Sequence, residues 1–187
     1  MNTTKTVSDL LAAAIGAKTH FDAWWTLSSQ AKLDFPDEMK DHPDFFSAVR
    51  DAHYTAYVVY FAQLFDKQSS AISLRKFLRH RKAKIENDKF SELDAKLTDL
   101  ERRAAGLLKI RHNLVAHVNG TRSEDEIFKE LKTTWYTIRD TIYDSANFTA
   151  ELVGADNPSS VEVPRNGRIS DATNRLLFQL RRAKSDA

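Results

Sequence analysis

The residues best suited to catalysis lie in one short segment, RHNLVAHVNG, at residues 111–120. It places Arg111 six positions before His117. A guanidinium binds a phosphate through two parallel hydrogen bonds and stabilises negative charge that develops on it. A histidine, with an unperturbed pKa of about 6.5, can give or take a proton at neutral pH. Together they suffice to cleave RNA, because the ribose 2′-hydroxyl can be deprotonated and attack the neighbouring phosphate. DNA lacks that hydroxyl, so only RNA could be cut in this way.

Arg111 also interrupts an apolar stripe that follows helical steps of three and four residues. The stripe consists of Leu93, Leu97, Leu100, Ala104, Leu107, Arg111, Leu114 and Val118. A guanidinium in a protein core is unfavourable unless it is paired or faces a polar cavity. Arg111 therefore either lines a phosphate-binding pocket or pairs with a buried carboxylate. In the second case His117 stabilises the helix C-terminus against the helix dipole, with no catalysis.

The segment resembles the signature of the HEPN ribonucleases. In that signature an arginine is followed at once by Asn, Asp or His, and a histidine comes a few residues later, near the end of a long helix. Arg111, His112 and His117 fill these places, and RHNLVAHVNG is most similar to the abortive-infection U branch. The resemblance implies a homodimer whose two signature helices form one RNA-cleaving cleft. It also implies a toxin or antiphage effector that an antitoxin protein holds in check.

The resemblance further implies that the polar residue after the arginine supports the active site. His112 would then orient Arg111 or hold the phosphate, and Asn113 would contact the RNA. The alternative for both is a solvated position on the flank of the helix. The sequence has no carboxylate cluster or histidine pair at clear metal-ligand spacing. We therefore predict a metal-independent reaction without a cofactor.

A basic run, RKFLRHRKAK at residues 75–84, is a second candidate site. Phe77 and Leu78 are expected to point inward, which would place the positive charges on a shared outer face. Such a face could hold an RNA backbone through counterion release. The predicted RNA contacts are Arg75, Lys76, Arg79, Arg81 and Lys82. The alternative is a solvated helix end.

Other distinctive residues are interpreted as structural. Trp24, Trp25 and Trp135 could stack on bases, but their helical spacing with other apolar residues favours packing in a core or interface. His53 lies on an aromatic helix face and is interpreted as a hydrogen-bonded core histidine. The acidic, proline-punctuated segment LDFPDEMKDHPDF, which includes Glu38, is expected to be an exposed linker.

These candidates must be positioned by helices. Periodicity and capping signals predict helices from about Ser8 to Lys18 (with a continuation after a bend at Gly16), Asp44–Asp66, Ser69–Leu78, Phe90–Val118, Ser123 past Ile142, and from about Ser170. The helices at 44–66 and 90–118 are expected to pack as antiparallel partners. The prediction is a single HEPN-like all-α domain at residues 1–187, a bundle of five to six helices with two long antiparallel central helices.

The composition agrees with this fold. The chain has 187 residues, a formal net charge of +2 and 42% hydrophobic residues, which is enough for one sizeable core. Five glycines and four prolines are too few for the turns of an all-β barrel, and the absence of cysteine excludes disulfides and thiolate metal sites. No apolar run approaches the about 20 residues that span a bilayer, and the N-terminus lacks the apolar core of a signal peptide. We expect a cytoplasmic protein without membrane contact.

Two functions remain in view. The first is a metal-independent endoribonuclease that acts as a toxin or abortive-infection effector against phage, with Arg111 and His117 as its catalytic residues. The alternative is a non-catalytic helical module that binds RNA or a protein partner. A DNA-binding regulator is less well supported, because we find no helix-turn-helix pattern.

Overall fold

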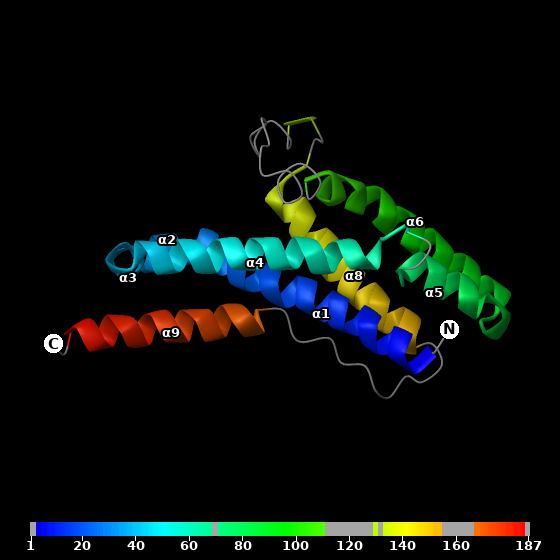
Figure 1. The fold of residues 1–187 in the computed structure, drawn as a ribbon, viewed down its shortest axis with the longest axis horizontal. Coiled ribbons are helices and arrows are strands. Elements are labelled where there is room, and N and C mark those ends of the chain that lie inside the picture. Colours follow the sequence, from blue (N-terminus) through cyan, green and yellow to red (C-terminus); the bar gives the residue numbers. More distant parts are fainter. Residues whose placement is uncertain (1–2, 69–70, 111–128, 131–132, 155–166, 186–187) are drawn as a thin grey trace.

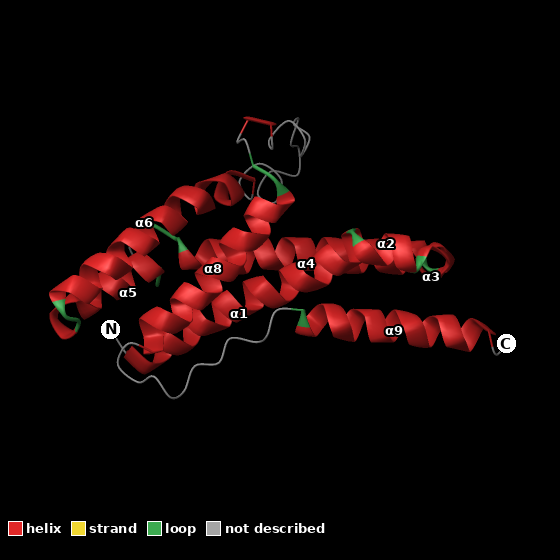
Figure 2. Cartoon of the chain, turned by 180° about the vertical axis from the view of Figure 1, so that it is seen from behind, coloured by secondary structure: helices red, strands yellow, loops and turns green. Residues whose placement is uncertain are grey.

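The computed structural model describes residues 3–68, 71–110, 129–130, 133–154 and 167–185. Within these ranges every regular element is a helix, as Figure 2 shows, and the all-α prediction is confirmed. The elements are α1 (Thr3–Ser28), α2 (Gln30–Asp34), α3 (Pro36–Asp41), α4 (Pro43–Leu64), α5 (Leu74–Arg81), a short 3₁₀ turn (Lys82–Lys84), α6 (Asn87–Ile110), α8 (Trp135–Gly154) and α9 (Arg168–Ser185). None of the described helices combines the length and the apolar character that crossing a membrane requires.

The centre of the fold is an antiparallel pair formed by α1 and α4 (Figure 1). Ala13, Ala14 and Ala17 on α1 are at most 3% exposed, and their small side chains let the two helices approach. Gly16 permits still closer contact, because a Cβ at this position would lie 2.9 Å from the ring of Tyr60 on α4. The glycine therefore serves packing, and α1 continues through it as one helix.

Two predictions about these helices are wrong. The first helix begins at Thr3, so Ser8 lies inside α1 and is not its N-cap. The helix predicted at 44–66 was expected to pair with the one at 90–118, whereas α4 packs mainly against α1 and only marginally against α6. The Ala- and Gly-rich face of α1 gives α4 the closer fit, and interior packing favours such complementarity.

α8 is shorter than the predicted helix. The prediction carried one helix from Ser123 past Ile142, but Thr133 and Thr134 are not helical, and Ser123 lies outside the described residues. The Thr134 hydroxyl accepts a hydrogen bond from the backbone N–H of Thr137 at 3.1 Å. This N-cap explains why α8 begins at the next residue, Trp135, because it satisfies an N–H that has no partner inside the helix.

α9 packs across α1 and α3 and closes a second, smaller core. That core consists of Leu27, Ala31, Phe35, Phe46 and Leu177. The acidic segment under α9 forms α2 and α3, and Glu38 is only 5% exposed, so the expectation of an exposed linker is wrong there. Arg181 of α9 donates to both carboxylate oxygens of Glu38, at 2.9 and 3.1 Å. These hydrogen bonds hold the pKa of Glu38 below its usual value.

A buried polar link joins α1 to α8. Lys18 and Asp22 are at most 3% exposed, and their side chains lie 3.2 Å apart. The Tyr143 hydroxyl of α8 donates to the other oxygen of Asp22. Burial, together with the Asp22 carboxylate, raises the pKa of Tyr143 well above its ordinary value. Removing either partner of the buried Asp22 carboxylate would be unfavourable, so the contact from Tyr143 fixes the position of α8 against α1.

Candidate functional site

The predicted signature residues lie outside the described ranges: Arg111, His112, Asn113 and His117. The structure does describe the helix that leads to them, because α6 ends at Ile110, immediately before Arg111. The stripe from Leu93 to Leu107 is buried as predicted, with no member more than 3% exposed, and Ile110 is 1% exposed. The core contacts of α6 therefore fix where the chain enters the signature segment.

Ion pairs fix the register of α6 against α8. Lys96 lies 2.9 Å from Glu151, and Arg103, two turns further along α6, lies 2.7 Å from Asp144, about two turns earlier on α8. The helices are therefore antiparallel, and the C-terminal end of α6 lies beside the N-terminal end of α8 (Figure 1). Each exposed pair stabilises the fold little, by about 0.2–1 kcal/mol, but together they define the alignment.

Arg75 fixes α5 against α6. Its guanidinium donates to both carboxylate oxygens of Glu101, at 3.0 and 2.7 Å, to the Thr98 hydroxyl at 3.1 Å, and also to Asp94. The hydrogen bond to Glu101 is the main reason that the pKa of Arg75 is raised. Two carboxylates compensate one guanidinium, so this arginine clamps two helices and presents little free positive charge.

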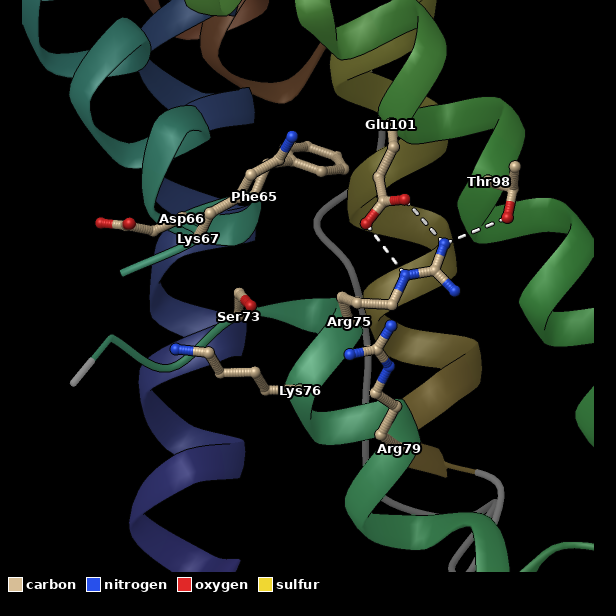
Figure 3. Close-up of a pocket in the computed structure, with 9 residues that line it drawn as sticks. All are labelled: Phe65, Asp66, Lys67, Ser73, Arg75, Lys76, Arg79, Thr98 and Glu101. Carbon is tan, nitrogen blue, oxygen red and sulfur yellow. Dashed lines mark hydrogen bonds and ion pairs between the residues drawn. The ribbon is translucent and has the colours of Figure 1, made fainter. Parts of the chain in front are cut away.

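A cavity of 480 Å³, which we call the basic pocket, lies beside this clamp (Figure 3). Three of the predicted RNA contacts, Arg75, Lys76 and Arg79, line it, and Arg79 stands beside Arg75 on the next turn of α5. Lys76 donates to the backbone carbonyl of Ala71 at 2.8 Å. Lys67, which follows α4, also lines the pocket and was not predicted, because no periodic pattern marks a turn residue. Neither Arg79 nor Lys67 forms an ion pair with a described residue.

The basic run does not share a single outer face. Phe77 and Leu78 are fully buried, as predicted, but Arg81 is only 3% exposed. It lies 5.3 Å from the Phe77 ring and donates to the carbonyls of Leu152 and Val153, near the end of α8, at 3.3 and 3.5 Å. Burial lowers the pKa of Arg81. The expectation that Arg81 lies on a shared outer face is wrong: it follows Phe77 by four residues and Leu78 by three, so it falls on their inner face.

Lys82 stands apart from the basic pocket. It is exposed at the start of the 3₁₀ turn, and its ammonium group lies 5.4 Å from the centre of the Phe90 ring. Two of the five predicted basic contacts, Lys82 and Arg81, are thus separated from the other three. RNA contact by Arg75, Lys76, Arg79 and Lys82 stays a prediction.

His53 forms the hydrogen bond expected of it. Its Nδ1 lies 2.8 Å from Nδ1 of His20 on α1, and the His20 ring stacks on Tyr60. Burial lowers the pKa of both histidines, and the neighbouring His20 adds to the effect at His53. Over the ranges that the structure covers, no group of three or more His, Asp or Glu side chains is arranged to hold a metal ion.

The fold and the sequence of the site together define a class of protein. A long helix of an all-α bundle leads directly into an Arg–His segment, which is the HEPN arrangement. Residues 2–155 match the HEPN family AbiU2, and the chain belongs to this family. No curated protein and no solved structure is significantly similar to it. The family match ends at residue 155, so α9 lies beyond it.

Proposed function

We propose that this protein is a metal-independent endoribonuclease that acts as an abortive-infection effector or toxin. The observation that carries the proposal is the family match, which spans residues 2–155 and so contains all of α6 and the Arg111–His117 segment. HEPN proteins are typically ribonucleases. The buried stripe of α6 adds a second argument, because a rigid helix leading into the site can hold its first residue in place.

The proposed reaction needs only the RNA and the signature side chains. The 2′-hydroxyl loses its proton and its oxygen attacks the adjacent phosphorus. The 5′-oxygen of the next nucleotide leaves and takes up a proton. The products are a 2′,3′-cyclic phosphate and a 5′-hydroxyl. Arg111 binds the phosphate and stabilises the extra negative charge of the transition state. His117 exchanges a proton or adds a second phosphate contact, His112 orients Arg111, and Asn113 contacts the RNA.

The working unit is proposed to be a homodimer with a composite site. Both copies of the signature segment would face one RNA, and the basic pocket of each copy would hold the backbone further along. Along the axis of α6, Glu101 in the basic pocket and Ile110 are separated by about 14 Å, at a rise of 1.5 Å per residue. One RNA strand can span that distance. A partner antitoxin would act by covering this surface.

Cleavage by the Arg111→Ala and His117→Ala variants tests the proposal. The assay follows an end-labelled single-stranded RNA, in EDTA, with a DNA of the same sequence alongside. The wild type should cut only the RNA and leave a 2′,3′-cyclic phosphate, and each variant should lose at least about 100-fold in rate, as expected for an acid–base or charge-stabilising group. Arg102→Ala is the matched control, because Arg102 is an exposed arginine of α6, 74% accessible, whose one ion-pair partner among the described residues is Asp99.

The same variants separate an enzyme from a non-catalytic module. For an enzyme, helicity, melting temperature and dimer mass stay near wild type while cleavage and growth arrest on induced expression are lost. Cleavage that survives both substitutions rules out the proposed chemistry. Substitutions that dissociate the dimer or unfold the chain, without any cleavage by the wild type, favour the binding module instead.

A further inference from the structure

A hollow of 440 Å³, separate from the basic pocket, lies where the end of α1, the middle of α4 and the first residue of α8 meet. We call it the aromatic pocket, because the rings of Trp24, Trp25, Tyr54 and Trp135 line it. Its volume falls within the range of about 300–1,000 Å³ that is usual for small-ligand sites. A planar group has room there.

The rings of this pocket are held from behind by the main core. Trp24 lies 5.7 Å from Phe21 and 5.6 Å from Tyr57, both of which are fully buried. It also lies 4.5 Å from Trp135, measured between ring centres. The tryptophans are half-buried, so they pack on the core as predicted and still present aromatic surface to the hollow. An aromatic wall fixed in advance lowers the entropy lost on binding.

Two cations stand at one edge of the aromatic pocket. Lys32 and Arg50 line it and also line an adjoining hollow of 290 Å³, so they lie on the boundary between the two. Neither forms an ion pair with any residue that the structure describes, whereas Arg75 and Arg181 are both bound by carboxylates. The Asp51 carboxylate also lines the aromatic pocket but not the adjoining hollow, so the positive charge is concentrated at the boundary. A phosphodiester there would meet Lys32 and Arg50, with an aromatic surface on one side.

The aromatic pocket is at the same end of the bundle as the entry to the signature segment. Trp135 begins α8, and the register of Arg103 with Asp144 places the start of α8 beside the end of α6. Ile110, at that end of α6, directly precedes Arg111. The aromatic pocket therefore lies at the end of the bundle where the chain enters the signature segment.

The geometry points to a nucleobase site: we propose that the aromatic pocket stacks one unpaired base of a single-stranded RNA while Lys32 and Arg50 hold the phosphate beside it. Aromatic stacking accepts any base, and the two cations select for the charged backbone. The proposal rests on the ribonuclease function above and adds the point that the substrate is bound as a single strand. Aromatic residues and arginine also occur at protein–protein hot spots, so a second copy of the chain is the competing occupant that the test must separate.

The test measures binding of a fluorescein-labelled 12-nucleotide RNA carrying 2′-O-methyl groups, which cannot be cleaved, to the full-length protein by fluorescence anisotropy. Trp135→Leu should weaken binding by about 5- to 100-fold, the range expected for loss of one stacked base. Trp135→Phe should recover most of it. Arg50→Gln should weaken binding and lower the slope of log K against log salt by about 0.7, as for one phosphate on a single strand. Phe178→Leu is the control, because Phe178 is an aromatic residue that is 55% exposed, packs on Phe35 and lines neither hollow.

Each outcome decides one question. The proposal is supported if the single strand binds more tightly than its duplex and the two pocket variants lose affinity while melting like the wild type. It is overturned if Trp135→Leu and Arg50→Gln bind as the wild type does, or if they change the dimer mass and leave RNA affinity intact. Should Trp135→Leu fail to fold, the salt slope of Arg50→Gln decides alone. RNA binding that depends on Trp135 without cleavage of unmodified RNA by the wild type contradicts the ribonuclease function and leaves the base site standing.

Discussion

Arg75 and Arg79 lie one turn apart on α5, line the same basic pocket, and should nevertheless respond oppositely to substitution. Arg75 is 20% exposed and its partners Glu101 and Asp94 are 34% and 45% exposed. Arg79 is exposed and has no ion-pair partner among the described residues. We therefore expect Arg75→Gln to reduce stability without changing RNA contact. Arg79→Gln should do the reverse.

The size of the stability effect follows from the partners. Exposed ion pairs contribute about 0.2–1 kcal/mol each, and Arg75 joins two carboxylates and a hydroxyl on α6. Solvent screens both carboxylates, so the loss for Arg75→Gln should be about 1–2 kcal/mol. For a chain of this length that lowers the melting temperature by roughly 2–8 °C. Arg79→Gln should stay within about 0.5 kcal/mol of wild type, as most surface substitutions do.

Thermal unfolding followed by circular dichroism measures the first effect, and the salt dependence of binding to a non-cleavable RNA measures the second. Arg79→Gln should lower the salt slope by about 0.7, and Arg75→Gln should leave it unchanged. Suppose instead that Arg75→Gln melts like the wild type and lowers the salt slope of RNA binding by about 0.7. The guanidinium would then be a phosphate ligand, as the sequence suggested, and the assignment of Arg75 as a clamp would be refuted.

Three further predictions concern the frame around the site. Leu97→Ala, at a fully buried position of α6, should cost about 2–5 kcal/mol in urea unfolding with an unchanged m-value, and a loss below about 1 kcal/mol would contradict its core position. The pKa values of His20 and His53 are lowered in the folded protein, so the unfolded chain binds more protons near pH 6. The free energy of unfolding should therefore fall as the pH drops below about 6.5. Between pH 7 and pH 5 the urea midpoint of His53→Asn should fall less than that of the wild type. Arg181 lowers the pKa of Glu38, so the stabilisation from the Arg181–Glu38 pair is present at neutral pH and disappears in acid. The difference in melting temperature between the wild type and Arg181→Gln should therefore narrow below about pH 4. A difference that stays constant with pH would argue against the pair.

Periodic apolar patterns carried the correct part of the sequence prediction. The steps of three and four from Leu93 to Leu107 determine which face of α6 is buried, and Phe77 and Leu78 were placed inward for the same reason. The same rule also locates Arg81, which follows both at helical spacing. The charge of Arg81 favours an outer face, whereas its spacing from Phe77 and Leu78 favours the inner face that it occupies. The buried face of a helix could therefore be predicted from the sequence better than the residues that pack against it.

Tertiary partners could not be predicted, because no local pattern encodes them. The close approach of α1 and α4 depends on Gly16 meeting Tyr60, 44 positions away, and the sequence alone suggested a bend at that glycine. The local sequence around Glu38 predicts an exposed acidic linker. It gives no sign of the hydrogen bond from Arg181 of α9, which is 143 positions away. α4 is apolar on two faces, and the small side chains of α1 allow the close approach of α1 to α4.

The described helices explain how the bundle fixes the point at which the chain enters the Arg–His segment. Ile110, at the end of α6, and Ile138, in the first turn of α8, are at most 3% exposed, so both helices are anchored in the core at the same end of the bundle. The clamp at Arg75 and the pairs that Arg103 and Lys96 form with α8 keep α6 from sliding along its axis. A helix sliding by one residue moves its end by about 1.5 Å and rotates it by about 100°, which would shift and turn the point at which the chain enters the signature segment. Weak surface pairs can therefore matter to activity through alignment even where they contribute little to the free energy of unfolding.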